Sequence, residues 1–427
     1  MTLNKLTMIA ATLTVAIAAN AATITDVTAR QRWPWNNLVD VDFFIEGESG
    51  EAYAIDLTAT AAGGEKTLCA TTFVTEPIAT AGVTNRVVWN LGADYPNFKA
   101  TDFKVTVTAT PFSGTTPVYL VVDLSEGSGA EKWPVRYTTT PPAHVRGATN
   151  EVCQTTELWL RRIPAGTDVL GEGTTGTTSG YVHLPQHTVV LTQPFYCAIF
   201  ETTEKQYERM NGSYWSSGNY SSEYSDDQFR NARPVRQISH NFIRGLSWPN
   251  NITASGVIQK LRSKTGLDGF DIPTEAQWEY ACRAGTDGQC YDTLSKIARY
   301  LDNRDSGQEG GLTAVAGTYL PNAWGLYDMI GNVSECCRDR GLSAISQYVP
   351  QYGGTYTNPI GPTSSQQANS TFVVRGGSHK NSSTYLPAPY RMNKANALSN
   401  YDDIGFRVVM VVGGVRNDNS SSEAPAE

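Results

Sequence analysis

The chain has 427 residues and a formal net charge of -8, and only 17% of its residues are charged, below the roughly 25% that is common in soluble domains. It has no basic run, so the phosphate backbone of a nucleic acid is not an expected partner. The length predicts two or three domains, and the abundance of Thr, Ser, Gly and Asn favours strands and polar turns over long surface helices.

Residues 1–21 are typical of a secretory signal peptide. Lys5 precedes a short apolar stretch at 6–19, which ends in the small residues of Ala19-Asn20-Ala21. The stretch is shorter than the run of about 18 apolar residues that a membrane anchor needs, and no later segment qualifies. We therefore expect an exported protein without a membrane span, which is periplasmic, on the cell surface or extracellular, with a mature chain that begins at Ala22.

The sequence contains seven cysteines. An oxidising compartment permits disulfides, and an odd count leaves at least one thiol unpaired. None of the spacings suggests zinc, and the adjacent Cys336 and Cys337 are unsuited to chelate one metal together. We expect one or two structural bridges and buried free thiols rather than a reactive cysteine.

Residues 22–137 are predicted to form a β-sandwich of immunoglobulin-like type. Val39, Val41, Phe43 and Ile45 occupy alternate positions, and residues 53–59 and 103–109 repeat this period of two. Frequent turn clusters separate these stretches, as in sandwich domains. No catalytic grouping is present, so we interpret this region as a spacer or adhesion module.

The next segment, 138–157, is predicted to be a linker, because Thr and Pro at 138–142 keep the chain extended. Residues 158–412 then form a second domain in which two helices are clear, one at about 254–264 and one that opens at Thr274 with a capping box to Gln277. The tail at 413–427 is polar and without periodicity, which predicts disorder. The fold class is therefore α+β with little regular secondary structure.

Seven segments of the second domain resemble motifs of the formylglycine-generating (sulfatase-modifying factor) family in order and spacing. They are IPAGT at 163–167, FETT at 200–203, PVRQIS at 234–239, PTEAQWEYACR at 273–283, NAWGLYDMIGNV at 322–333, RGGS at 375–378 and IGFR at 404–407. The resemblance covers about 158–412 and implies a variant of the C-type lectin fold.

A carboxylate pair flanks a Gly-Asn turn in this domain. Asp328 and Glu335 could together wrap one hard cation, since Ca²⁺ takes six to eight oxygen ligands; alternatively, they hydrogen-bond the backbone of a tight turn. The resemblance implies a structural calcium ion held by the side chains of Asp328 and Glu335 and the carbonyls of Gly331 and Val333.

The family's oxidase chemistry is not expected to persist. The resemblance implies copper held by two cysteines after the RGGS motif, because soft thiolates select Cu(I). Those positions are Asn381 and Leu386 here, and no cysteine follows Cys337, so we expect no copper. Some relatives bind iron through a histidine cluster, but His183 and His187 have no third ligand nearby and are interpreted as ordinary histidines.

Buried Glu and Arg residues allow two interpretations. Glu201 and Glu279 could be active-site carboxylates or anchors for arginine and backbone groups. The four arginines of the motif region could hold an anionic ligand or brace carboxylates and carbonyls in a loop-rich core, and we favour the second role; they are Arg283, Arg375, Arg391 and Arg407.

The segment 379–404 is crowded with Asn, Ser, Tyr and Ala and lies between the RGGS and IGFR motifs. Adaptable polar residues with Tyr are typical of paratopes, and the arrangement resembles the variable region of diversity-generating retroelement proteins; polar loops reach a similar composition unaided. We predict that the loop faces solvent, that its middle does not touch the core, and that its tyrosines dominate ligand binding. The predicted ligand-facing residues are His379, Asn381, Ser383, Tyr385, Tyr390, Asn393, Asn396 and Tyr401.

Two classes of function follow. The first is an exported, non-catalytic binding or scaffold protein for a protein or glycan ligand at the cell exterior. The alternative is a formylglycine-generating-type oxidoreductase with altered metal use that acts on exported proteins. The missing cysteine pair favours the first class.

Overall fold

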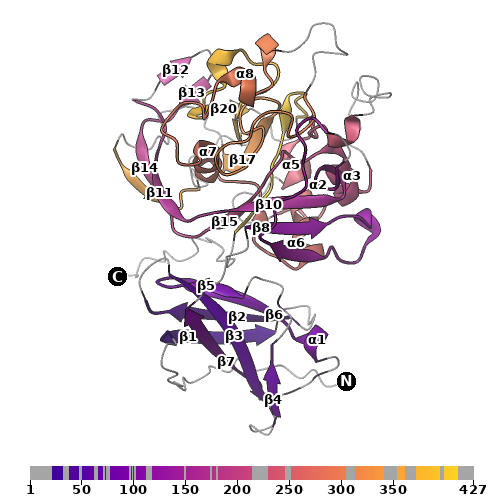
Figure 1. Cartoon of the computed structure of the whole chain (residues 1–427), viewed down its shortest axis with the longest axis vertical. Coiled ribbons are helices and arrows are strands. Elements are labelled where there is room, and N and C mark those ends of the chain that lie inside the picture. The colour runs from indigo at the N-terminus through magenta and orange to yellow at the C-terminus, as the bar shows by residue number, and fades with distance from the viewer. Residues whose placement is uncertain are drawn as a thin grey trace, which may run out of the picture. The chain divides into compact units, whose positions relative to one another are not determined.

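The structure is a computed structural model and describes residues 22–31, 38–47, 51–61, 66–70, 73, 77–95, 98, 100, 102–111, 118–148, 151–173, 176–178, 181–213, 229–245, 252–303, 313–340, 353–360, 372–394 and 399–411. The chain divides into two compact units at Thr116 and Pro117 (Figure 1). The predicted signal peptide and tail lie outside the described residues. Within the described part, no helix has the length and apolar character needed to span a membrane.

The N-terminal unit consists of two antiparallel sheets that share one apolar core around Trp89. Val41, Phe43 and Ile45 are fully buried, as the alternating pattern predicts. One sheet has the order β1-β2-β6; in the other, β3 pairs with β4, β5 and β7. The elements are β1 (Ile24–Gln31), β2 (Leu38–Ile45), β3 (Ala52–Ala61), β4 (Lys66–Cys69), β5 (Ile78–Thr80), β6 (Thr84–Asn90), α1 (Leu91–Asp94) and β7 (Lys104–Pro111).

The C-terminal unit contains three sheets. A six-stranded antiparallel sheet has the order β16 (Phe270–Asp271), β22 (Val409–Val411), β15 (Phe195–Ala198), β10 (Glu157–Ile163), β8 (Tyr119–Asp123) and β9 (Val135–Thr138). A second has β11 (Gly166–Leu170), β14 (His187–Leu191) and β18 (Thr355–Thr357). The third has β12 (Gly176–Thr178), β13 (Tyr181–His183), β20 (Tyr390–Lys394), β19 (Phe372–Arg375), β17 (Ser334–Arg340) and β21 (Ile404–Gly405).

Helices of the C-terminal unit are short. They are α2 (Val152–Thr155), α3 (Glu204–Asn211), α5 (His240–Ile243), α6 (Val257–Thr265), α7 (Glu275–Arg283) and α8 (Leu294–Ile297). Both predicted helices are confirmed as α6 and α7. The capping box of α7 is also confirmed: Gln277 N–H donates to Thr274 Oγ1 (3.1 Å), and Thr274 N–H donates to Gln277 Oε1 (3.0 Å). This helix, labelled in Figure 1, places Trp278 in the largest apolar core of the C-terminal unit.

The predicted boundary at residue 137 is wrong. β8 and β9 pair with each other and, through β8, with β10 of the C-terminal unit. Leu120, Val121 and Val122 are all fully buried, so β8 has no solvent face and its sequence shows no alternation that would assign it to either unit.

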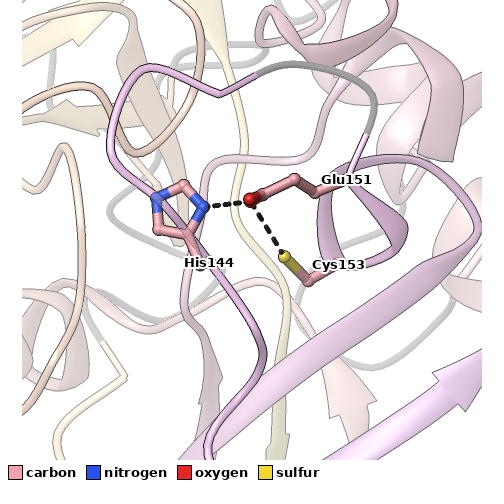
Figure 2. Close-up of side chains that lie close together, drawn as sticks. All are labelled: His144, Glu151 and Cys153. Atoms are coloured by element: carbon pink, nitrogen blue, oxygen red, sulfur yellow. Dashed lines mark hydrogen bonds and ion pairs between the residues drawn. The ribbon is translucent and has the colours of Figure 1, made fainter.

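The predicted linker at 138–157 ends in folded structure, which corrects that prediction. Its last part forms α2 and begins β10, and Gln154 donates a hydrogen bond from Nε2 to the Ala316 carbonyl (2.8 Å). His144, Glu151 and Cys153 lie close together beside this helix (Figure 2). The segment is therefore attached to the C-terminal unit by side-chain contacts rather than hanging free between two domains.

All seven cysteines belong to the described residues, and all are free thiols. The expected one or two structural bridges are therefore not present. Five of the seven side chains are buried, Cys290 is half-buried, and Cys69 is exposed. Burial raises the pKa of Cys153 and Cys197 to about 12, as expected for inert thiols in apolar surroundings.

Candidate functional site

The turn that follows Tyr327 is built by residues whose backbone most amino acids avoid. Asp328, Gly331 and Asn332 all have positive φ, at 53°, 82° and 57°. A Cβ on Gly331 would lie 2.4 Å from the Arg299 carbonyl oxygen, so only glycine fits there. Asn322 holds the start of the motif, because its Oδ1 accepts the Leu326 N–H (3.1 Å). The motif is thus a tight turn fixed by its own side chains.

Asp328 is buried at 1% exposure and has one oxygen to spare. Its Oδ2 accepts the Gly317 N–H at 2.7 Å, whereas Oδ1 has no hydrogen-bond partner among the described residues. Burial raises the pKa of this carboxyl to about 6. An unpartnered buried carboxylate oxygen is what a hard cation would use.

Glu335 is equally buried, but both of its oxygens are occupied. Arg407 donates to it from Nε (3.1 Å to each oxygen) and from a terminal nitrogen (2.7 Å), and Trp278 Nε1 donates at 2.8 Å. Burial lowers the pKa of Arg407, but the adjacent Glu335 outweighs this and raises it overall. Glu335 is therefore first of all the partner of Arg407.

Glu201 is a third carboxylate at this turn. From the sequence it could be either an active-site carboxylate or an anchor. Its Oε1 accepts the Val333 N–H (3.0 Å), and its Oε2 accepts the Asn332 side-chain amide (2.6 Å). Burial and the nearby Asp328 and Glu335 raise its pKa well above the usual range. These contacts support the interpretation of Glu201 as an anchor. The feature of the sequence that pointed to this residue is its place in the FETT motif.

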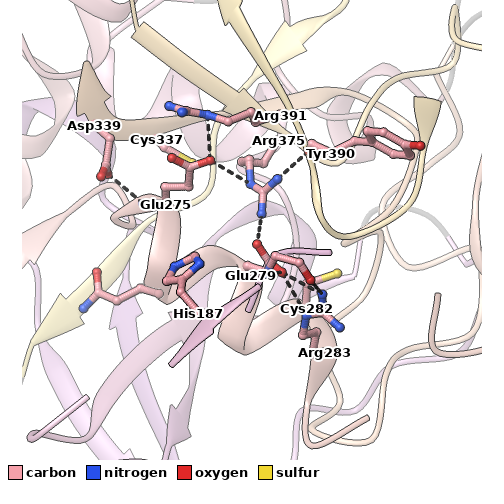
Figure 3. Close-up of polar contacts among 12 residues, drawn as sticks. His187, Glu275, Glu279, Cys282, Arg283, Cys337, Asp339, Arg375, Tyr390 and Arg391 are labelled. Carbon is pink, nitrogen blue, oxygen red and sulfur yellow. Dashed lines mark hydrogen bonds and ion pairs between the residues drawn. The ribbon is translucent and has the colours of Figure 1, made fainter. Parts of the chain in front are cut away.

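A second buried charge network joins α7 to β19 and β20 (Figure 3). Glu279 accepts from Arg375, from Arg283 Nε (2.9 Å) and from the Gly171 N–H (2.8 Å). Glu275 Oε1 forms an ion pair with Arg391 Nε at 2.9 Å. Burial raises the Glu279 pKa, but Arg375 and Arg283 outweigh it, so the pKa lies below the usual range. These contacts match the predicted bracing role of the arginines.

The ends of loop 379–404 are held together. Ser378 Oγ donates to Asp403 Oδ2 (3.2 Å), and the Lys380 ammonium pairs with the Asp402 carboxylate. A Cβ on Gly377, whose φ is 67°, would lie 2.6 Å from a Leu386 methyl group, so the backbone approaches too closely for any larger residue.

The prediction that the whole loop faces solvent is wrong for its first residue and its middle. His379 is fully buried, with its Nδ1 2.9 Å from the Asn332 carbonyl oxygen, and burial lowers its pKa to about 4. Leu386 and Ala388 belong to the main core, and β20 runs through the third sheet. A polar stretch thus enters the interior because two apolar residues and one strand anchor it.

The remaining predicted ligand residues separate into three groups. Ser383 is exposed, and Asn381, Tyr385, Tyr390 and Tyr401 are half-buried. The side chain of Asn393 and the whole of Asn396 lie outside the described part. Two short surface stretches, 380–385 and 399–403, are therefore what the described loop presents to solvent.

Asn381 and Leu386 occupy the positions where the family resemblance places copper-binding cysteines. Asn381 Oδ1 accepts from the Ser378 N–H (2.8 Å) and from Ser378 Oγ (2.9 Å). Leu386 is fully buried and packs in the core. Both side chains thus serve the fold, and neither offers a soft ligand.

Comparison with known proteins places the C-terminal unit. It is similar to the formylglycine-generating enzyme of Thermomonospora curvata, at 32% identity over 122 residues that are 26% of this chain and 38% of the relative. It is also similar to that of Mus musculus, at 31% identity over 156 residues that are 33% of this chain and 38% of the relative. The chain thus matches less than two fifths of these relatives' length.

Among solved structures, Treponema denticola variable protein 1 matches with a TM-score of 0.47 and 23% identity, over 63% of this chain and 99% of that one. The model of the sulfatase-modifying factor enzyme 1-like domain matches residues 148–412, which is more than half of the chain. The chain therefore belongs to the sulfatase-modifying factor enzyme 1-like family.

Proposed function

We propose that the chain is an exported, non-catalytic binding protein that uses its family domain as a scaffold for a ligand surface in loop 379–404. The observation that carries this proposal is the nature of the two expected copper positions. Asn381 ties the loop to Ser378, and Leu386 fills the core. Without a thiolate at either position, the domain lacks the ligands that would hold Cu(I).

The surface stretches 380–385 and 399–403 form the ligand surface in this proposal. Their composition combines exposed Ser383 and Thr384 with half-buried Tyr385 and Tyr401. Tyrosine supplies contact area at a small cost in conformational entropy, and serine supplies adaptable hydrogen bonds. The ligand class is a protein or glycan at the cell exterior, and genetic diversification of this loop belongs to the same proposal.

A structural calcium ion at the Asp328 turn is part of the proposal. Asp328 fits, because its Oδ1 is buried without a partner among the described residues. The carbonyls of Gly331 and Val333 lie in the same turn. Glu335 already accepts four contacts from Arg407 and Trp278, so it would bind the ion only by giving up one of them. A bound ion would offset the negative charge that three buried carboxylates place opposite one arginine.

We also assign fold types within this proposal. Two antiparallel sheets around one core support an immunoglobulin-like N-terminal unit. The motif order and the loop-rich C-terminal unit support a C-type lectin variant. In such an arrangement, a stable sheet scaffold carries variable loops, which is the usual relation between scaffold and binding site.

A peptide assay tests the absence of catalysis. The full chain, supplied with copper and O₂, is incubated with a Cys-x-Pro-x-Arg peptide, and the peptide mass is followed. We expect no mass loss. The double variant Asn381→Cys with Leu386→Cys should gain Cu(I) binding, whereas each single variant should not, because two thiolates are needed. A mass loss caused by the unaltered chain would overturn the proposal and favour the oxidoreductase alternative.

A binding assay tests the ligand surface. Full chain is applied to arrays of defined glycans and of purified cell-surface proteins. The double variant Ser383→Arg with Thr384→Arg places bulk and charge at exposed positions and should abolish the signals of the unaltered chain without unfolding it. Ser263→Arg, at an exposed serine of α6, is the matched control and should bind normally. Signals that survive the double substitution would remove this loop from the ligand surface.

A second variant tests the tyrosines. Tyr385→Ala with Tyr401→Ala should strongly lower ligand binding, because aromatic side chains dominate binding energies. Circular dichroism checks that the variant is folded. If the variant unfolds, the tyrosines are structural, and the ligand surface is limited to the exposed serine and threonine positions.

A further inference from the structure

Three side chains of different chemistry converge beside α2, outside loop 379–404. His144 Nδ1, a Glu151 carboxylate oxygen and Cys153 Sγ all lie within 4.8 Å of one another (Figure 2). Glu151 is the residue before α2, and Cys153 lies in its first turn. Their side chains are directed toward a common point, and nothing in the proposed binding function uses them.

The imidazole of His144 is held in one orientation. Its Nε2 lies 3.1 Å from the Gly317 carbonyl oxygen, and the rings of Phe200 and Tyr327 pack edge-on against it at 4.9 and 5.1 Å between centroids. Its side chain is 3% exposed. A histidine that binds a metal through one nitrogen usually donates the other N–H to a backbone carbonyl or carboxylate. His144 has this arrangement: Nε2 faces the Gly317 carbonyl, and Nδ1 faces Glu151, where the ion would lie.

His144 and Cys153 both contact the same carboxylate oxygen of Glu151. His144 Nδ1 and Cys153 Sγ each contact Glu151 Oε2, the sulfur at 3.7 Å. The second carboxylate oxygen accepts the Val145 N–H at 2.9 Å, which fixes the carboxylate. One divalent cation at the point of convergence would contact all three groups.

We propose that His144 Nδ1, Glu151 and Cys153 Sγ bind a Zn²⁺ ion, with water in the fourth position. Nitrogen, oxygen and sulfur donors together suit this borderline-soft cation, whereas Ca²⁺ and Mg²⁺ take oxygen ligands. The site is buried except at Glu151, whose side chain is 17% exposed. This edge gives the ion an entry path and gives the water ligand its place.

The thiol would be deprotonated on binding. In the metal-free chain the thiol contacts the Ala143 carbonyl oxygen and Glu151 Oε2. A cation would take the place of the thiol proton as the partner of the sulfur. Binding therefore releases the thiol proton, as thiolate coordination requires.

The site would connect two parts of the C-terminal unit. The Gly317 peptide accepts from His144 through its oxygen and donates its N–H to Asp328 Oδ2 at 2.7 Å. An ion on His144 would thus attach residues 144–153 to the turn at 313–318 and, through Gly317, support Asp328.

Cobalt and zinc titrations of the full chain test the inference. Metal-free, reduced chain is titrated with Co²⁺, and we expect one ion per chain with a thiolate-to-cobalt charge-transfer band. Zn²⁺ should displace the cobalt, and competition with a chromophoric chelator gives its affinity. Cys153→Ser keeps a hydroxyl that can donate to Glu151, so it preserves a purely hydrogen-bonded cluster. It should nevertheless lose the band and bind Zn²⁺ more than about 100-fold more weakly, since loss of an outer partner alone typically costs 10–100-fold.

Cys290→Ser, at a half-buried cysteine in the same unit, is the matched control and should keep both the band and the affinity. Glu151→Gln provides a second test that is independent of the serine variant and should weaken Zn²⁺ binding as well. The inference is overturned if the unaltered chain binds no Co²⁺ or Zn²⁺ in competition with the chelator. It is also overturned if cobalt binds without a thiolate band, or if Cys153→Ser or Glu151→Gln binds Zn²⁺ as the unaltered chain does.

Discussion

The two units differ in which polar groups they bury: the N-terminal unit buries paired strand backbone, and the C-terminal unit also buries pairs of charged side chains. In the N-terminal unit, β3 pairs with β7 along residues 53–60, and side chains alternate between core and solvent. Among the described residues, Asp40 is the only buried charged or polar side chain of that unit. The C-terminal unit instead buries whole ion pairs, including Arg244–Asp271, Arg375–Glu279 and Arg407–Glu335.

This difference indicates which side-chain substitutions should destabilise each unit. A sheet stabilised by many equivalent backbone pairs tolerates the loss of one polar side chain at its surface. A loop-rich unit held by specific buried charges does not, because removing one partner leaves the other charged and desolvated. Each unit has its own core, so calorimetry of the full chain should resolve their transitions and show which one moves.

The largest effect is expected from Glu279→Ala. This substitution leaves Arg375 and Arg283 buried without their shared carboxylate and should destabilise the C-terminal unit by about 3–5 kcal/mol. The comparable change in the N-terminal unit is Asp42→Ala. Asp42 pairs with Arg86 at 2.7 Å in a pair that is about one quarter exposed, and its loss should cost at most about 1 kcal/mol. Calorimetric transition temperatures of both variants provide the measurement.

Glu279→Gln separates charge from shape in this experiment. The amide oxygen can still accept the Gly171 N–H, but the negative charge between two guanidinium groups is gone. We expect most of the loss seen with alanine. If glutamine restores the transition temperature, hydrogen bonds rather than charge hold the C-terminal unit, and the contrast between the units disappears.

The sequence predicted those elements of both units whose signals are local. Period-two alternation is a local signal, and it identified the strand at 38–45 correctly. The capping box of Thr274 and Gln277 is local as well. β8 shows the opposite case: it is buried on both faces, so its apolar run has no period and gave no indication of which sheet it joins.

The prediction for the middle of loop 379–404 was wrong for a related reason. Its Asn, Ser and Tyr content predicted exposure, but Leu386 and Ala388 reach the core because of where the third sheet runs. His379 is buried by Asn332, a residue far away in sequence. The convergence of His144 with Cys153 was missed because one histidine and one cysteine make no recognisable metal spacing, and α2 was predicted as linker.

The second prediction tests this corrected view of the loop. Leu386→Ala should destabilise the C-terminal unit by about 2–5 kcal/mol, since it removes a fully buried side chain and leaves a cavity. Ser383→Ala, three residues earlier and exposed, should change stability by less than about 0.5 kcal/mol. Equal, small effects of both substitutions in urea unfolding would mean that the loop is independent of the core, as first predicted from its composition.

The third prediction concerns calcium. If an ion uses the spare oxygen of Asp328, Ca²⁺ at about 100 times its dissociation constant should stabilise the C-terminal unit by about 2.7 kcal/mol. Chelation should lower only that unit's transition temperature, and Asp328→Ala should remove the response. A melt that is identical with calcium and with chelator would leave the turn stabilised by hydrogen bonds alone.

The smallest effect is expected from a proton at Asp339 of β17, which extends the contrast to titratable groups. Burial and the nearby Glu275 raise the pKa of this carboxyl to about 7. In the unfolded chain an Asp titrates near 3.9, so between about pH 4 and pH 7 the folded chain keeps a proton that the unfolded chain has released. The stability of the C-terminal unit should therefore fall as pH rises through this window and level off above it.

Asp339→Asn imitates the protonated carboxyl at every pH and keeps an oxygen to accept the Glu275 N–H, which now donates to Oδ2 at 2.7 Å. The variant should match the unaltered chain near pH 4 and become the more stable of the two as pH rises toward 8, because the amide has no proton to lose in this window. The transition of the N-terminal unit in the same scans is the internal control and should be identical in both proteins. If the two proteins keep a constant difference from pH 4 to pH 8, Asp339 is ionised throughout, and the charge pairs of the C-terminal unit accommodate it as they accommodate Glu279.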